Sequence, residues 1–255
     1  MNIVGDPRLG AVADAHPYPL LFATVSGAHL YGFASADSDV DLRGVHVLPW
    51  REVVGLEVGP DTIERMGDES GLDLDLVTHD AAKFFRLMLR PNGYVLEQLF
   101  SPLVVRASAT LEELRTLGEG CITRWHSRHY LGFAATQWRL FRGDQPRRVK
   151  PLLYTYRVLL TGIRLMRTGK VEANLRALNE EARLSHVDDL IACKVAGAEK
   201  EEVGDASLEF HAAEYARLRE LLEREAQATN LPEQPSARRG LHALLVELRR
   251  DAARR

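Results

Sequence analysis

The chain has 255 residues, of which 45% are hydrophobic and 27% are charged, and its formal net charge is −3. These proportions are typical of an ordinary soluble protein, and no apolar stretch approaches the length of a membrane span. Two cysteines, Cys121 and Cys193, lie far apart and exclude a disulfide framework or a cysteine-rich metal site. The N-terminal residues lack the basic-then-apolar order of a secretion signal, so we expect a cytoplasmic protein with reduced thiols and no membrane partner.

The first part of the chain predicts a mixed α/β fold. Its apolar and alternating segments predict strands at residues 20–26, 40–47, 62–66 and 72–78. The last two flank a short polar stretch and are expected to form a hairpin. Helices are predicted at residues 51–56, from about residue 80 to Pro91, and from Asn92 to Phe100.

From about residue 107 onward the pattern is helical almost throughout. Candidate helices cover residues 109–118, 121–142, 148–168, 171–183, 186–196, 207–228 and 237–252. Glycine and proline interrupt the pattern at residues 143–146, at Gly169 and at residues 231–235. We therefore predict an α/β module over residues 1–105, followed by a helical module over residues 106–255.

The net charge hides an asymmetry along the chain. Residues 1–120 carry 9 basic and 18 acidic side chains, whereas residues 121–179 carry 12 basic and 2 acidic ones. Such a basic block favours a surface that binds a polyanion. The alternative is a solvated basic helix face that docks on the acidic half. The candidates for phosphate contacts are Arg147, Arg148, Lys150, Arg157, Arg164, Arg167 and Lys170.

Two aspartates one residue apart, Asp39 and Asp41, are the most informative feature of the sequence. Residues i and i+2 of a strand face the same side, so both carboxylates are predicted to point into one small volume. Such a pair repels itself unless a cation lies between its members, and hard divalent cations such as Mg²⁺ prefer carboxylate oxygens. Upstream, Ser26 and Gly27 end the first apolar run, and a glycine there lets a backbone N–H approach a phosphate closely. The combination predicts a site for phosphoryl transfer.

This arrangement resembles the nucleotidyltransferase superfamily of polymerase beta, whose signature is a Gly-Ser or Gly-Gly turn followed by Asp-x-Asp or Asp-x-Glu between hydrophobic positions. Two stretches are also similar to the bacterial and phage family described as RNA-repair-pathway, polymerase-beta-like: Ser26-Gly27-Ala28-His29-Leu30-Tyr31-Gly32-Phe33 and Ser38-Asp39-Val40-Asp41-Leu42-Arg43-Gly44-Val45. Weaker similarity extends over roughly residues 20–250, at Lys83-Phe84, Asn92, Leu96-Glu97-Gln98-Leu99, Tyr130-Leu131-Gly132-Phe133-Ala134, Lys150, Tyr154 and Tyr156-Arg157.

The resemblance implies an α+β fold, with a small mixed sheet as the nucleotidyltransferase core and a helical domain after it. It also implies that Asp39 and Asp41 bind Mg²⁺ or Mn²⁺, and that a third carboxylate lies on a neighbouring strand. Asp73 and Asp75 share one parity on the 72–78 segment, and Asp75 is favoured. The two metal-binding aspartates and Asp75 would be the catalytic residues.

The substrate that the resemblance implies is a nucleoside triphosphate. The candidate nucleotide-binding residues are Ser26, Gly27, Ala28, Ser38, Arg43 and Lys83. Arg43 either faces the phosphates or forms a salt bridge with an acid, and Lys83 either meets the triphosphate or is a solvated lysine. Many superfamily members have serine where this chain has Ala28, so a hydroxyl contact to phosphate must come from elsewhere.

The sequence therefore predicts a metal-dependent nucleotidyltransferase that transfers an NMP from an NTP, with an RNA 3′ end in RNA repair or processing as the acceptor. The RNA acceptor follows from the family and from the basic block, where Arg147, Arg148, Lys150 and Arg157 are expected to bind it. One alternative is NMP transfer to a protein or a small molecule. The other is a catalytically inactive RNA-binding protein.

Overall fold

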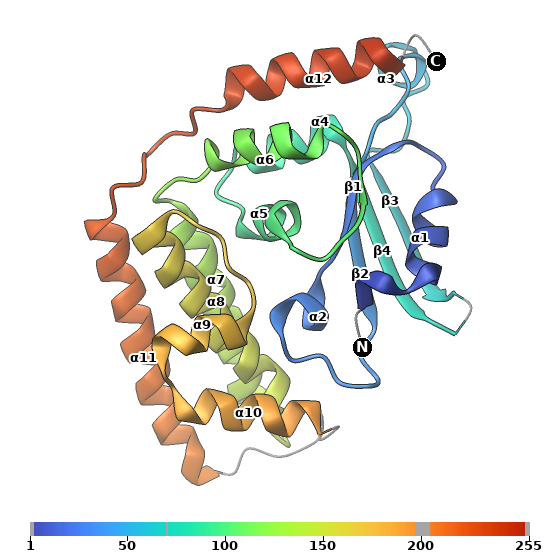
Figure 1. Cartoon of the computed structure of the whole chain (residues 1–255). Coiled ribbons are helices and arrows are strands. Elements are labelled where there is room, and N and C mark those ends of the chain that lie inside the picture. Colours follow the sequence, from blue (N-terminus) through green and yellow to red (C-terminus); the bar gives the residue numbers. More distant parts are fainter. Residues whose placement is uncertain (1–2, 70, 197–204, 253–255) are drawn as a thin grey trace. The chain divides into compact units, whose positions relative to one another are not determined.

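In the computed structural model, the apolar segments of the first part of the chain form a five-stranded sheet in the order β3-β4-β2-β1-β5 (Figure 1). The strands are β1 (Leu20–Val25), β2 (Val40–His46), β3 (Thr62–Asp68), β4 (Asp73–Asp80) and β5 (Val104–Ala107). β2 and β4 run parallel, whereas the other neighbouring strands run antiparallel, and β3 and β4 form the predicted hairpin. The mixed sheet confirms the predicted fold class. β5 was not predicted.

The described residues, 3–69, 71–196 and 205–252, divide into two units. The first unit comprises Met1–His29, Asp39–Ile122 and Gln234–Arg255, and the second comprises Leu30–Ser38 and Thr123–Glu233. These units differ from the predicted modules of residues 1–105 and 106–255. The chain leaves the first unit for Leu30–Ser38 and again after Ile122. It returns at Gln234, and the apolar residues of its last helix complete the core of the first unit.

Side-chain caps define the starts of several helices in the first unit. Asp6 accepts a hydrogen bond from the backbone of Arg8, and Pro7 occupies the first helical position. Asp80 and Asn92 cap the next two long helices in the same way. The helices of this unit are η1 (Ile3–Gly5), α1 (Pro7–Asp14), α3 (Arg51–Val54), α4 (Ala81–Met88), α5 (Gly93–Phe100), α6 (Leu111–Glu119) and α12 (Arg238–Ala252).

Each face of the sheet packs against its own helices. Strand alternation sends Phe22 and Val45 to one face, where they join side chains of α4, α5, α6 and α12 in a buried cluster. Leu42 and Leu74 lie on the other face in a second cluster with Leu9 of α1. Burying one such side chain contributes roughly 1.5–3 kcal/mol. The two clusters therefore hold β2 and β4 in a single register.

Five helices form most of the second unit: α7 (His126–Gly143), α8 (Val149–Thr168), α9 (Leu175–Ala182), α10 (Ser185–Val195) and α11 (Asp205–Ala228). Helix α8 is central, because it contacts the other four and most of its side chains are buried. Gly162 permits close packing, since a Cβ atom there would lie 2.9 Å from Leu222 and 3.0 Å from Tyr130. None of the described helices is both long and apolar enough to cross a membrane.

Two buried histidines make the stability of the second unit sensitive to acid. Burial lowers the pKa of His126 and of His211 to about 4, against 6.5 for an unperturbed side chain. The unfolded state therefore binds more protons than the folded state between about pH 6.5 and about pH 4. We expect the free energy of unfolding to fall as the pH falls through this range, by about 1.4 kcal/mol per pH unit for each histidine.

Urea denaturation followed by circular dichroism at about pH 7 and about pH 5 measures this loss. The His211→Gln variant is expected to lose less stability on acidification than the wild-type protein, because glutamine takes up no proton. The hydroxyl of Tyr156 lies 2.8 Å from His211 Nδ1, and an amide side chain retains a hydrogen-bonding group for it. If acidification lowered the free energy of unfolding of both proteins equally, His211 would not be a source of the acid sensitivity.

Candidate active site

Asp41 and Asp75 lie side by side on the two parallel strands. Asp41 of β2 is in register with Asp75 of β4, so the two side chains leave the same face of the sheet. Arg43 follows Asp41 by two residues on that face. Its Nη2 atom lies 2.5 Å from Asp41 Oδ1 and 2.7 Å from Asp75 Oδ2. A guanidinium group therefore bridges the two carboxylates and offsets their mutual repulsion.

The environment of Arg43 keeps this bridge charged. The side chain is only 9% exposed, and its Nε atom donates a hydrogen bond to the Tyr94 hydroxyl at 3.0 Å. Its Nη1 atom donates to the backbone oxygen of Asp75. Burial opposes the charge, but the hydrogen bond to Asp75 and the groups of Tyr94 and Asp41 outweigh it and raise the pKa of Arg43 above its usual value. Of the two roles predicted for Arg43, the structure shows the salt bridge.

Tyr94 is the residue of this group that sequence reasoning missed. It lies in the first turn of α5, where its backbone N–H donates to Asn92 Oδ1 at 3.2 Å. The predicted cap at Asn92 was therefore a usable signal for the helix start. It gave no signal that the hydroxyl of Tyr94 meets an arginine on a strand 51 residues earlier.

The glycine turn lies against Asp41. The backbone N–H of Ser26 donates to the backbone oxygen of Asp41 at 2.8 Å. Gly27 has a φ of 59°, and a Cβ atom there would lie 1.7 Å from Asp41 Oδ2. Both the conformation and the space therefore require glycine at this position. Gly27 begins α2 (Gly27–Tyr31), a helix of five residues.

Two buried oxygen atoms near this turn have no hydrogen-bond partner within the described part of the chain. Ser26 Oγ is one, and the side chain of Ser26 is fully buried. Asp75 Oδ1 is the other, and it is the oxygen that Arg43 leaves unused. A buried acceptor of this kind is costly without a partner, and a cation is one group that satisfies a carboxylate oxygen. The donor set of Asp41 and Asp75 therefore fits a divalent ion.

Asp39 is placed differently from the prediction. β2 begins at Val40, so Asp39 precedes the strand and its side chain is exposed. It forms no hydrogen bond or ion pair with another described residue. Within the described ranges no three His, Cys, Asp or Glu side chains are grouped as a metal site. The physical reason is that the pairing of β2 with β4 begins only at Val40, so the sheet does not fix Asp39 beside Asp41.

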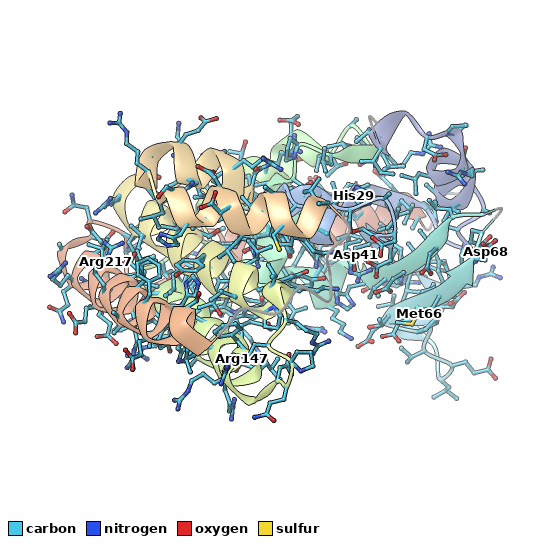
Figure 2. The ribbon with its side chains drawn as sticks, turned by 90° about the horizontal axis from the view of Figure 1, so that it is seen from below. His29, Asp41, Met66, Asp68, Arg147 and Arg217 are labelled. Carbon is cyan, nitrogen blue, oxygen red and sulfur yellow. The ribbon has the colours of Figure 1, made fainter. Side chains whose placement is uncertain are left out.

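The two alternatives for the third carboxylate occupy different positions on β4. Asp75 is in register with Asp41, whereas Asp73 is exposed and pairs in register with Asp68 of β3. Figure 2 shows Asp68 and Met66 on β3, the strand at the edge of the sheet, and Asp41 farther in. Only Asp75 is therefore beside the Asp41 carboxylate.

Lys83 does not join this group. It lies in the first turn of α4, where its Nζ atom is 3.0 Å from Asp61 Oδ1 and also contacts the Thr62 hydroxyl. Helix α4 follows the C-terminal end of β4, and Asp75 lies near the start of that strand. Asp80 lies five positions after Asp75 along the strand, a distance of about 16 Å. The predicted contact between Lys83 and a triphosphate is not supported.

Ser38 and Ala28 are the remaining predicted nucleotide-binding residues. Ser38 Oγ accepts a hydrogen bond from the backbone N–H of Ser35 at 3.0 Å, so its hydroxyl is engaged within the 30–38 segment. Ala28 is 6% exposed and directly follows Gly27. The buried hydroxyl nearest in sequence to the turn is therefore that of Ser26.

Several members of the basic block are paired or buried within the second unit. Arg157 was predicted to contact phosphates, but its side chain is buried and its guanidinium carbon lies 3.7 Å from the centre of the Tyr31 ring. Arg148 pairs with Asp144 at 2.8 Å. The structure therefore places the Arg157 side chain in the interior of the second unit and not on its surface. Arg148 and Lys150 are exposed, and Arg147 is half-buried near the start of α8 (Figure 2).

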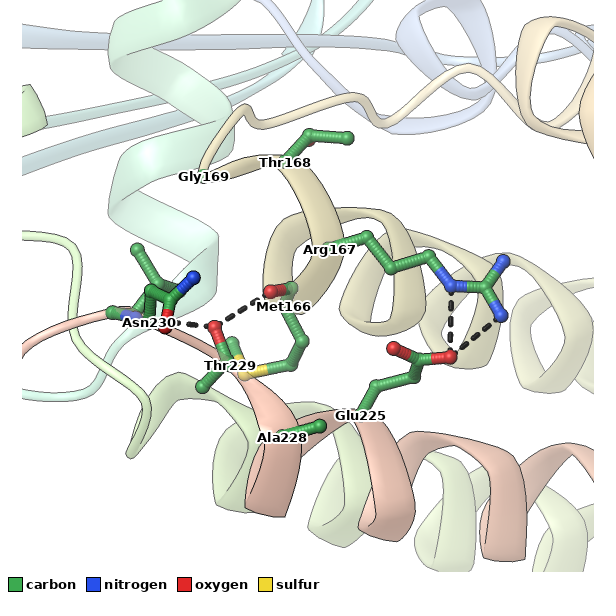
Figure 3. A pocket seen from close by; sticks show the side chains of 9 residues that line it. Met166, Arg167, Thr168, Gly169, Glu225, Ala228, Thr229 and Asn230 are labelled. Atoms are coloured by element: carbon green, nitrogen blue, oxygen red, sulfur yellow. Dashed lines mark hydrogen bonds and ion pairs between the residues drawn. The ribbon is translucent and has the colours of Figure 1, made fainter.

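Other arginines of the block also have acidic partners. Arg164 pairs with Glu181, and Arg167 pairs with Glu225 of α11 at 2.6 Å. Figure 3 shows the second pair beside a pocket at the end of α8, where the Thr229 hydroxyl donates to the backbone oxygen of Met166 at 2.6 Å. These pairs favour the interpretation of Arg164 and Arg167 as structural residues.

Comparison with known proteins identifies a family and two relatives. A sequence model of the RNA repair pathway DNA polymerase beta family, RlaP, matches residues 1–247, which confirms the predicted resemblance. Uncharacterized protein MJ0002 of Methanocaldococcus jannaschii is 26% identical over 221 residues, which span 85% of this chain and 88% of the relative. Uncharacterized protein YcgL of Bacillus subtilis is 28% identical over 155 residues, which span 60% of this chain and 58% of the relative.

Two solved structures are similar at a greater distance. One is a nucleotidyltransferase-like protein from Exiguobacterium sibiricum, with a TM-score of 0.34 and 14% identity, covering 89% of this chain and 75% of that one. The other is the spectinomycin adenyltransferase AAD(9) from Enterococcus faecialis with ATP and spectinomycin. Its TM-score is 0.41 and its identity 16%, covering 80% of this chain and 92% of that one. The family assignment rests on the match over residues 1–247.

Proposed function

The chain belongs to the RNA repair pathway DNA polymerase beta family, and on this basis we propose that it is a metal-dependent nucleotidyltransferase that transfers an NMP from an NTP to an RNA 3′ end. The observation that carries the proposal is the group of Asp41, Arg43 and Asp75 beside the Gly27 turn. A carboxylate pair next to a glycine turn combines the two parts that phosphoryl transfer needs, a metal site and a phosphate cradle.

The proposed roles follow from the positions of the residues. Asp41 and Asp75 hold Mg²⁺ or Mn²⁺, with exposed Asp39 joining them from the segment before β2. The bound metal supplies charge neutralisation at the phosphates and a lower pKa for the attacking hydroxyl group. In this proposal Asp75 also accepts the proton of that hydroxyl, which is supported by the buried Oδ1 atom that has no hydrogen-bond partner among the described residues.

The glycine turn binds the triphosphate in this proposal. The backbone N–H groups of Gly27 and Ala28 donate to phosphate oxygens, and the Ser26 hydroxyl supplies the contact that Ala28 lacks. Arg43 acts on the carboxylates, since its guanidinium group is bonded to both of them and to Tyr94. It holds one oxygen of each carboxylate and thereby orients the other.

The RNA acceptor is the less direct part of the proposal. It is supported by the description of the family and by the exposed basic side chains of Arg148 and Lys150 at the start of α8. Arg157 no longer supports it, because that side chain is buried over Tyr31. The experiment therefore distinguishes NMP transfer to RNA from NMP transfer to a protein.

The test is label transfer from each of the four α-labelled NTPs to an RNA oligonucleotide in the presence of Mg²⁺ or Mn²⁺. We expect labelled RNA that is destroyed by nuclease and survives protease, and no product with chelator. Label that survives nuclease and is lost on protease treatment would overturn the RNA acceptor but retain the transfer reaction. The absence of any labelled product from a folded protein with every NTP and both metals would overturn the proposed activity.

A further inference from the structure

A groove on the first unit is lined by none of the residues of the proposed active site and has its own chemistry. It is an open groove of about 470 Å³ between α4 and α12, two helices that contact each other. Its floor is apolar and consists of Phe85, Leu89, Leu241 and Leu245. Phe85 and Leu241 are 3% and 2% exposed, so the floor is continuous with the buried core of the unit.

The rim of the groove is entirely basic. The charged or titratable side chains that line it are Arg86, Arg238, Arg239 and His242, and all four are exposed. None of them forms an ion pair with another residue in the described part of the chain. Arg249, on the same helix α12, shows the contrast, because it is buried and bonded to Asp80 at 2.5 Å. The rim cations therefore lack an acidic partner of the kind that Arg249 has.

The spacing of the lining residues is that of two helix faces. On α4 and its C-terminal cap the lining positions are 82, 85, 86 and 89, and on α12 they are 238, 239, 241, 242 and 245. Both sets contain the pattern i, i+3, i+4 and i+7, which marks one face over two turns of a helix. Two such faces form a channel about 10 Å long, and a third helix is the element that fits between them.

We infer that this groove binds an amphipathic α-helix of a partner protein, with apolar residues at i, i+3, i+4 and i+7 and with Asp and Glu on both sides of that stripe. The apolar floor takes the apolar stripe, and Arg86, Arg238 and Arg239 face the flanking carboxylates. A nucleic acid suits the floor less well, because the only aromatic ring in it, Phe85, is buried and offers no face for base stacking.

The probe for the test is a fluorescent peptide of about 14 residues with leucine at i, i+3, i+4 and i+7 and glutamate beside them. One control peptide carries lysine in place of glutamate, and a second has the same composition with the leucine spacing scrambled. Binding is measured by fluorescence anisotropy on the full chain. We expect the glutamate peptide alone to bind, with an affinity that falls as salt is raised from about 50 mM to about 300 mM.

Charge reversal locates the site. The double variant Arg86→Glu/Arg239→Glu is expected to weaken binding of the glutamate peptide roughly tenfold or more, because two rim attractions become repulsions. Arg250→Glu is the matched control, because Arg250 is exposed on the same helix and does not line the groove. We expect less than about a twofold effect from it. Hydrogen exchange is expected to slow in residues 81–89 and 238–245 when the peptide binds.

Several results would overturn the inference. Equal binding of the three peptides is one, and equal affinity of the wild-type protein and the rim double variant is another. Binding of a single-stranded RNA oligonucleotide that the same double variant abolishes would show that the rim serves a nucleic acid. None of these outcomes depends on NMP transfer, so the proposed activity and the groove are tested separately.

Discussion

Asp41→Asn and Asp75→Asn are each expected to lower the rate of NMP transfer by about a thousandfold or more, which corresponds to about 4 kcal/mol in the activation barrier. Each change leaves the side-chain volume nearly constant and removes the negative charge that binds a divalent ion. In the proposed reaction Asp75→Asn also replaces the carboxylate that accepts the proton of the attacking group by an amide, which is a much weaker base. The measurement is single-turnover label transfer at saturating NTP.

Asp73→Asn is the matched control for these two variants. Asp73 lies on the same strand as Asp75 with the same parity, but it is exposed and in register with Asp68. We expect its rate to remain within about twofold of the wild type, as for most exposed substitutions. If Asp73→Asn lost as much activity as Asp75→Asn, the third carboxylate would be assigned to the wrong residue. Thermal unfolding of each variant checks that the fold is retained.

The repeating patterns of the sequence predicted most of the secondary structure. The strand at residues 40–47 alternates apolar residues with Asp41 and Arg43, and the helices after residue 107 have apolar stripes bounded by glycine and proline. β5 was missed because it has only four residues, too few for alternation to be recognised. The helix at Pro7–Asp14 was also missed, although Asp6 and Pro7 give the usual signals of a helix start.

The candidate site was predicted in its residue types and only partly in its geometry. The spacing of Asp41 and Arg43 places both on one face, but it does not say whether the arginine turns to a phosphate or to a carboxylate. Which residue of β4 lies beside Asp41 depends on the register between β2 and β4. These strands are more than 25 residues apart in the chain, and no local sequence pattern encodes their register. Asp39 shares its parity with Asp41, yet the strand pairing begins only at Val40.

Helical periodicity also left the role of Arg157 undetermined. Its spacing from Lys150 places both near one side of α8, and a basic stripe normally indicates a solvated or nucleic-acid-binding face. In the structure α8 is surrounded by other helices, and Arg157 is buried against the Tyr31 ring. Tyr31 reaches this position because residues 30–38 belong to the second unit. That assignment depends on tertiary contacts, which the sequence pattern alone does not contain.

Arg43→Met is expected to lower the free energy of unfolding by about 3 kcal/mol when no divalent ion is present, because it leaves two adjacent carboxylates without their shared cation. The side chains of Asp41 and Asp75 are 20% and 24% exposed, so water compensates them only in part. Urea denaturation in the presence of chelator measures the loss. Arg65→Met is the control, because Arg65 pairs with Glu69 in an exposed ion pair that contributes at most about 1 kcal/mol.

The effect of Mg²⁺ on stability is a second measurement for the Arg43→Met variant. It tests whether the carboxylates that Arg43 bridges also bind a divalent ion. A ligand that binds only the folded state stabilises it by an amount that grows with its affinity. Removing Arg43 makes the pair of Asp41 and Asp75 more negative, so we expect Mg²⁺ to raise the urea midpoint of Arg43→Met more than that of the wild type. An equal effect of Mg²⁺ on Arg43→Met and Arg65→Met would mean that the carboxylate pair does not bind the ion. Recovery by Mg²⁺ of most of the lost stability would show that Arg43 and a divalent ion satisfy the same two carboxylates.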